Sequence, residues 1–212
     1  MFAIKNARIL TVTNGIMENG SVLMDEGKII AVGETVTIPE EAEILNAEGK
    51  WVMPGLIDLQ SVPSIENIPS WERALNRQFG FTKVGVIPEE TRDLVLVKPS
   101  DCIVNEPELW KLQFDKLVKM EQQGIDFCLV RDKGAGPRLH LSMIGIAVER
   151  GVPFDAALRA LTINPAKLLG LENTIGSIEV GKCAELTVFD GNPFLNTSLC
   201  EMSIVSGVID KN

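Results

Sequence analysis

The sequence predicts an α/β protein in which strands from both ends of the chain form a small composite β-sandwich around an inserted middle. Residues 1–53 form a series of short strand patterns separated by turn residues. The middle alternates strand and helix patterns, which is typical of βα units around a parallel sheet. Strand patterns return after Ile175. We therefore expect one domain from residues 1–53 and 176–212 and a second from residues 54–175.

The N-terminal strands are separated by short turn signals. "FAIKNARILTV" alternates apolar and polar residues, and "TNG" follows it as a turn. "GSVLMDEGKIIAVG" gives two strands around an Asp-Glu-Gly turn, and "AEILNAEGKWVMPG" gives two more. This spacing predicts a small antiparallel sheet or half of a sandwich.

The middle combines short apolar strands with amphipathic helices. In chain order, the patterns predict a helix at 70–80, strands at 81–88 and 93–99, and a helix at 106–124. A strand at 125–132 and a helix at 137–151 follow, and "VPFDAALRALTINPAKLLGL" adds one helix and a second, short one. The helix at 106–124 has the clearest pattern, since its leucines share one stripe and Gly124 can end it.

Composition excludes several classes of function. No run approaches 18 apolar residues, so we expect no membrane span. The net charge of −9 argues against a nucleic-acid partner, which would require a basic surface. The N-terminus lacks the layout of a signal peptide, and the four cysteines form no CxxC pair. These features predict a cytoplasmic protein with reduced, mostly buried thiols, Cys128 among them.

Three stretches carry a family resemblance: "EGKWVMPGLID" (48–58), "TINPAKLLGLENTIGSIEVGKCAELTVFDGNPF" (162–194) and "SIVSGVID" (203–210). They resemble the amidohydrolase superfamily, and most of all its imidazolonepropionase-like and dihydroorotase-like cyclic amidases. The resemblance implies a β-sandwich built from both termini and a metal-dependent (β/α)8 barrel between them. It also implies hydrolysis of C–N bonds other than peptide bonds.

The metal ligands that the resemblance implies are largely missing. The family motif Asp-x-His-x-His begins at Asp58, so its histidines fall on Gln60 and Val62. Valine has no donor atom, and glutamine is a poor ligand for zinc-class metals. The single histidine, His140, lies in a helical pattern, where we expect it to pack. Asp132 matches the aspartate of the family's last strand, but one ligand does not make a site, so we expect neither a metal nor a cofactor.

The length of the middle predicts a truncated barrel. Residues 54–175 comprise 122 residues, whereas a full (β/α)8 barrel takes about 250. We therefore expect about four strands, which leave two open sheet edges with unpaired backbone groups. The apolar runs "DLVLV" and "DFCLV" need cover, so we expect a homodimer.

Four residues are candidates for a site. Asp132, at the end of a buried strand, could be catalytic or could order the following "KGAG" turn. Asp58 could be a relic ligand, a general base or a structural group, with Gln60 beside it. Arg138 could contribute to an anion-binding turn at a helix start. The run "GSIEVGKC" (176–183) nearly spells a phosphate-binding loop, but a strand pattern follows it where a helix is required.

Three functions remain open. The first is a catalytically degenerate homologue that acts as a binding or assembly subunit. The second is a hydrolase in which Asp132 and a water replace the metal, a weak route because bound metal lowers the pKa of water from about 15.7 to about 7. The third is a protein that binds a small molecule in the residual cleft.

Overall fold

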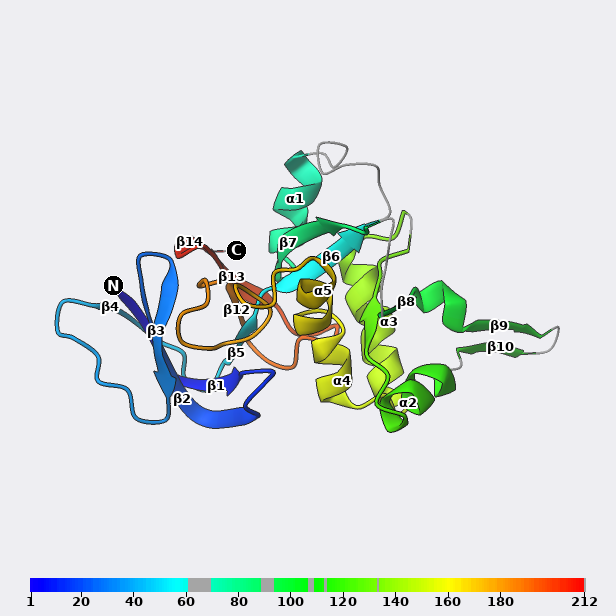
Figure 1. Cartoon of the computed structure of the whole chain (residues 1–212), viewed down its shortest axis with the longest axis horizontal. Helices are drawn as coiled ribbons and strands as arrows, with labels where there is room; N and C mark the ends of the chain where they lie inside the picture. Colours follow the sequence, from blue (N-terminus) through cyan, green and yellow to red (C-terminus); the bar gives the residue numbers. More distant parts are fainter. Residues whose placement is uncertain (61–69, 89–93, 107–108, 113, 133, 212) are drawn as a thin grey trace.

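The computed structural model describes the whole chain except residues 61–69, 89–93, 107–108, 113, 133 and 212. Figure 1 shows a large sheet that carries both chain termini, beside a part in which short strands alternate with helices. The sheet strands are β1 (Phe2–Leu10), β2 (Ile16–Asp25), β3 (Lys28–Gly33), β4 (Glu43–Asn46), β5 (Trp51–Pro54), β12 (Leu186–Phe189), β13 (Cys200–Val205) and β14 (Val208–Lys211).

The large sheet joins the two ends of the chain. Its strand order is β14-β13-β12-β5-β1-β2-β3, and β4 pairs with β1 outside this path. The mixed α/β class with a large sheet agrees with the prediction. The finer prediction of a two-layered sandwich is not confirmed, because these strands belong to one hydrogen-bonded sheet.

Strand β1 pairs with two different strands along the same edge. Residues 2–5 pair in parallel with β4, and Arg8 and Ile9 pair in parallel with β5. Between these two halves, Asn6 has a φ of 55°, a left-handed conformation that asparagine tolerates better than most residues. The Asn6 side chain also donates a hydrogen bond to Asn46 Oδ1 at 2.8 Å. This break in β1 separates the stretch that pairs with β4 from the stretch that pairs with β5.

A shared apolar core explains why the two ends fold together. Ile4 and Val52 come from the N-terminal strands, and Leu186 and Ile204 come from the C-terminal strands. All four side chains are fully buried or nearly so in one cluster. Burying each such side chain contributes roughly 1.5–3 kcal/mol to the stability of the fold. Neither end of the chain alone supplies all the residues of this cluster.

The middle of the chain contains two parallel strand pairs. One pair is β6 (Leu56–Gln60) with β7 (Phe81–Val86), and the other is β8 (Val95–Val97) with β11 (Phe127–Leu129). A non-strand segment links them, since Ile57 N–H donates to Leu161 O at 2.8 Å and Leu129 N–H donates to Ala160 O at 3.1 Å. The described part of the middle thus has four parallel strands, and the predicted assembly into a truncated barrel is not confirmed.

The helices of the middle pack around these strands (Figure 1). They are α1 (Ser70–Arg77), α2 (Asp115–Gln122), α3 (Pro137–Glu149), α4 (Phe154–Arg159) and α5 (Ile163–Leu168), with a 3-10 turn, η2, at Pro99–Cys102. Helix α3 begins at Pro137, as predicted, because proline is well suited to the first helical turn. None of the described helices is long and apolar enough to cross a membrane.

The predicted helix at 106–124 is wrong in its first half. Strands β9 (Ile103–Glu106) and β10 (Leu109–Leu112) form an antiparallel hairpin there, and α2 occupies only Asp115–Gln122. Pro107 lies outside the described residues, but a proline disfavours the helical conformation at the residue before it, here Glu106. A segment as short as the four residues of β10 fits either periodicity, so the pattern alone did not separate strand from helix.

Other predicted features lie where expected. Residues 176–183 form turns before β12, so the strand-to-helix geometry of a phosphate-binding loop is absent at this place. Three of the four cysteines are buried, and burial raises the pKa of the Cys128 thiol to about 12. His140 is also buried on α3.

Candidate functional site

The candidate site is centred on Asp58, near the carboxyl end of β6. Side chains alternate across a strand, so Ile57 and Leu59 enter one apolar cluster while Asp58 and Gln60 share the opposite face. The Asp58 side chain is only 1% exposed. A carboxylate this deeply buried needs a compensating charge or several hydrogen-bond donors.

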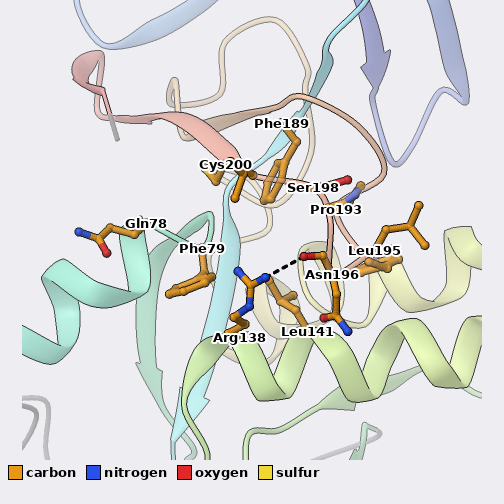
Figure 2. A pocket seen from close by; sticks show the side chains of 12 residues that line it. Gln78, Phe79, Arg138, Leu141, Phe189, Pro193, Leu195, Asn196, Ser198 and Cys200 are labelled. Carbon is orange, nitrogen blue, oxygen red and sulfur yellow. Dashed lines mark hydrogen bonds between the residues drawn. The ribbon is translucent and has the colours of Figure 1, made fainter.

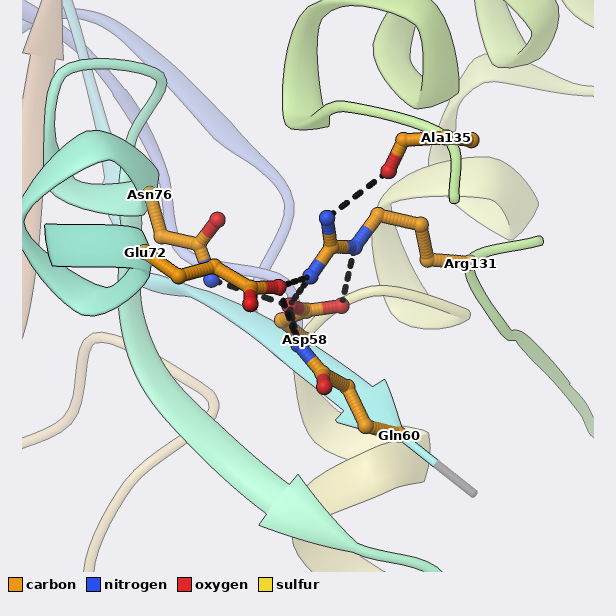
Figure 3. A network of polar contacts seen from close by, with 6 residues as sticks. All are labelled: Asp58, Gln60, Glu72, Asn76, Arg131 and Ala135. Atoms are coloured by element: carbon orange, nitrogen blue, oxygen red, sulfur yellow. Dashed lines mark hydrogen bonds and ion pairs between the residues drawn. The ribbon is translucent and has the colours of Figure 1, made fainter. Parts of the chain in front are cut away.

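Arg131 supplies that charge from the segment that follows β11 (Figure 3). Its Nε donates to Asp58 Oδ1 at 3.1 Å and its Nη2 to Asp58 Oδ2 at 2.7 Å, a two-pronged contact. Nη2 also contacts Glu72 Oε1 at 2.5 Å, and Nη1 donates to Ala135 O at 2.8 Å. All three guanidinium nitrogens are therefore hydrogen-bonded.

Two amide side chains complete the network. Gln60 Nε2 donates to Asp58 Oδ2 at 2.8 Å and to Glu72 Oε1 at 3.0 Å. Asn76 Nδ2 donates to Asp58 Oδ2 at 2.9 Å. Glu72 and Asn76 are four residues apart on α1, so they lie on the same helix face. Asp58 Oδ2 thus accepts from Arg131, Gln60 and Asn76 together.

Electrostatics keep the guanidinium charged. Burial lowers the pKa of Arg131, but the neighbouring carboxylates of Asp58 and Glu72 outweigh burial and raise that pKa above its ordinary value. The Arg131 side chain is 7% exposed, so water screens the pair only weakly. We name these five side chains the Arg131 network: Asp58, Gln60, Glu72, Asn76 and Arg131.

The residues present do not fit the metal centre that the family motif implies. A metal needs free lone pairs, yet the Asp58 oxygens face the N–H groups of Arg131, Gln60 and Asn76. Across the residues that the structure describes, no group of three or more His, Cys, Asp or Glu side chains could hold a metal ion. Val62 lies outside the described residues. A guanidinium stands here as the cation that the buried carboxylate requires.

Asp132 lies next to Arg131 in the chain but has different partners. The Ser100 hydroxyl donates to Asp132 Oδ1, and Ser100 N–H donates to Oδ2 at 3.2 Å. The Asp132 carbonyl accepts from Ala135 N–H at 3.0 Å, within the predicted turn. Asp132 therefore connects this turn to η2.

Arg138 lies at a different place from Asp58 and Gln60. Its Nη2 donates to Asn196 O at 2.7 Å, across a small cavity that Phe79 and Phe189 also line (Figure 2). The cavity has a volume of about 30 Å³, room for one or two water molecules. Arg138 therefore has a hydrogen-bond partner that is not part of the Arg131 network.

His140 is a buried residue of α3 that faces strand β7. Its side chain is near Phe81, with ring centroids 6.2 Å apart, and its Nδ1 has no hydrogen-bond partner among the described residues. Burial lowers the pKa of His140 to about 4, an effect that outweighs the nearby Asp58 carboxylate. The ring is therefore neutral near pH 7.

Three residues of the Arg131 network were not predicted from the sequence: Glu72, Asn76 and Arg131. Two signals point to them in retrospect. Arg131 directly follows an apolar strand pattern. A charged residue at this position lies at the carboxyl end of the strand, where α/β proteins place their ligand-binding sites. Glu72 and Asn76 have the spacing of one helix face.

Comparison with known proteins gives consistent results. The sequence model of the Amidohydrolase family matches residues 95–211. An imidazolonepropionase from Fusobacterium nucleatum subsp. nucleatum is 42% identical over 77 residues, which cover 34% of this chain and 18% of that protein. A dihydroorotase from Pelobacter propionicus is 32% identical over 91 residues, which cover 40% of this chain and 21% of that protein.

Solved structures share the fold. The crystal structure of an amidohydrolase from Thermotoga maritima MSB8 aligns with a TM-score of 0.76 at 18% identity, covering 100% of both chains. The N-acetylglucosamine-6-phosphate deacetylase from Pasteurella multocida aligns with a TM-score of 0.67 at 15% identity, again covering 100% of both chains. By contrast, the chain matches less than a quarter of the length of the two curated relatives.

Proposed function

This chain belongs to the amidohydrolase family, and from that premise we propose that it is a catalytically degenerate member that acts as a binding or assembly subunit. The Arg131 network supports this most directly, because the guanidinium binds the carboxylate at which the family's metal motif begins. Gln60 stands at a histidine position and directs its amide N–H at Asp58. Both arrangements direct N–H groups at the Asp58 carboxylate, where a metal would need free lone pairs.

The alternative is an active hydrolase that uses Asp132 and a water. Such a carboxylate would have to activate water alone, whereas a bound metal lowers the pKa of water from about 15.7 to about 7. Both Asp132 oxygens already accept hydrogen bonds from Ser100. These contacts favour a structural role for Asp132 over a general base.

The assembly partner that we propose is a second copy of this chain. Among the described strands, β7 pairs only with β6 and β8 only with β11, so each has an edge without a strand partner. Val95 on β8 is 37% exposed, although parallel strands are usually covered. A twofold dimer is the commonest closed assembly and would cover such an edge.

A hydrolysis assay tests the proposed loss of activity. The purified full chain is incubated with dihydroorotate, hydantoin or imidazolonepropionate, with and without added zinc. We expect no turnover above the buffer rate under either condition. Turnover without added zinc that disappears in Asp132→Ala would overturn the proposal and favour the hydrolase.

A further inference from the structure

We propose that Asp58, Gln60, Glu72 and Asn76 form a guanidinium-binding site that Arg131 fills from within the chain, and that free guanidinium compounds bind there once Arg131 is shortened. This inference concerns the ligand class of the site. It rests on the geometry of the Arg131 network and is independent of the proposed assembly role.

The receptor groups and the ligand group come from different parts of the fold. Asp58 and Gln60 lie on β6, and Glu72 and Asn76 lie on α1. These two elements and β7 follow one another in the chain. Arg131 arrives from the segment after β11, 73 residues from Asp58 in the chain. The receptor groups therefore remain on their own elements when the Arg131 side chain is removed.

The hydrogen-bond pattern selects a planar, multidonor cation. Asp58 takes one edge of the guanidinium with both oxygens, while Glu72 takes a second contact from Nη2. Ala135 O accepts from Nη1 on the remaining side. A lysine ammonium is a compact point charge and cannot match the two-pronged edge. A metal ion would face the N–H groups of Gln60 and Asn76.

Burial makes the site dependent on a cation. Asp58 is 1% exposed and Asn76 is fully buried, so water cannot easily replace the lost positive charge. Asn76 Oδ1 also has no hydrogen-bond partner among the described residues, so one buried acceptor stays unused. An empty site would leave two carboxylates close together with no cation between them.

The test compares Arg131→Gly with Arg159→Gly in the full chain. Arg159 is a matched control because it also binds two carboxylates, Glu121 and Asp155, but is 27% exposed on the surface. The unfolding midpoint of each variant is measured against methylguanidinium chloride up to about 20 mM, with sodium chloride at equal ionic strength. For a Kd of about 1 mM, ligand binding should raise the midpoint of Arg131→Gly by about 5 °C.

We expect this rise only in Arg131→Gly, with no rise in the Arg159→Gly variant or the natural chain. A second variant, Arg131→Gly with Asp58→Asn, removes the buried charge pair and should show no rise. If Arg131→Gly alone does not fold, its refolding yield should increase with methylguanidinium but not with sodium chloride. A folded Arg131→Gly that gains no more than Arg159→Gly, or a refolding yield that methylguanidinium leaves unchanged, would refute the site.

Discussion

At the scale of single residues, a guanidinium stands where the family motif leads one to expect a metal. Arg131 satisfies Asp58 and Glu72 with directed hydrogen bonds, and Gln60 and Asn76 add two donors. Removing one partner of such a pair leaves an uncompensated buried charge, whereas removing both is far less costly. The contribution of the network to the free energy of unfolding therefore depends on both partners being present.

A double-mutant cycle measures that coupling. We expect Arg131→Met and Asp58→Asn each to lower the free energy of unfolding by about 3–5 kcal/mol, because each leaves a buried polar partner unsatisfied. The double variant should lose clearly less than the sum of the two losses. Arg159→Met, at a more exposed pair, should cost about 1 kcal/mol or less. Strictly additive losses in urea unfolding would contradict the coupling.

His140 predicts a pH dependence of stability. Its pKa is about 4 in the folded protein, against 6.5 for an ordinary histidine, so the unfolded chain binds the proton more tightly. The stabilising contribution is complete above pH 6.5 and is lost as the pH falls toward 4, by about 3 kcal/mol. His140 is the only histidine, so His140→Gln should flatten the urea-unfolding profile in this window. An unchanged slope would rule His140 out.

Part of this site was predictable from the sequence. The motif around Asp58 and Gln60 marked the strand end at which the network lies, and Gln60 and Val62 differ in residue type from the histidines of the family motif. Arg131 was not found, because its partner lies 73 residues away and depends on which strand ends meet. Arg138, which the sequence suggests for an anion-binding turn, instead donates a hydrogen bond to Asn196 O at 2.7 Å (Figure 2).

At the scale of elements, tertiary contacts decide what local patterns leave open. The helix that begins at Pro137 was predicted well, because proline is suited to the first helical turn and Gly151 follows the helix end. The hairpin of β9 and β10 was not predicted, because a pattern only four residues long does not distinguish a strand from a helix turn. The joining of β1 to both β4 and β5 depends on long-range pairing, which no local pattern encodes.

Helix α3 gives a prediction that reverses the usual helix rule. Replacing a helical glycine by alanine normally stabilises by about 1 kcal/mol. At Gly145, however, an added Cβ would lie 2.1 Å from the backbone oxygen of Phe194, so the helix must move away from the C-terminal segment. We expect Gly145→Ala to destabilise by about 1–3 kcal/mol. Glu149→Ala, exposed on the same helix, should stay within about 0.5 kcal/mol. Equal thermal midpoints for both variants would contradict this close approach.

At the scale of the whole molecule, strands from the two ends of the chain pair in one sheet, and among the described strands β7 and β8 each have one edge without a strand partner. We propose that residues 1–53 and 176–212 form one domain and residues 54–175 the other. The shared core of Ile4, Val52, Leu186 and Ile204 supports the first domain. The open edges of β7 and β8 support an assembly that covers the second.

The assembly proposal has a direct test in solution. A single chain has a mass of 23.2 kDa, and light scattering at micromolar concentration should report about twice that mass. A charge placed on the open edge, Val95→Lys, should weaken the dimer without affecting the large sheet. A clean monomer at all concentrations would mean that the chain's own helices cover the strands sufficiently.

The central claim is that Arg131 has taken the place of a metal, and metal content tests it most directly. The purified chain is incubated with zinc, dialysed, and its zinc, iron and manganese are measured per chain by elemental analysis. We predict well under one metal ion per chain, both as purified and after incubation, because the donor groups around Asp58 are already bound to Arg131. Close to one metal ion per chain, lost again in Asp58→Asn, would contradict the claim.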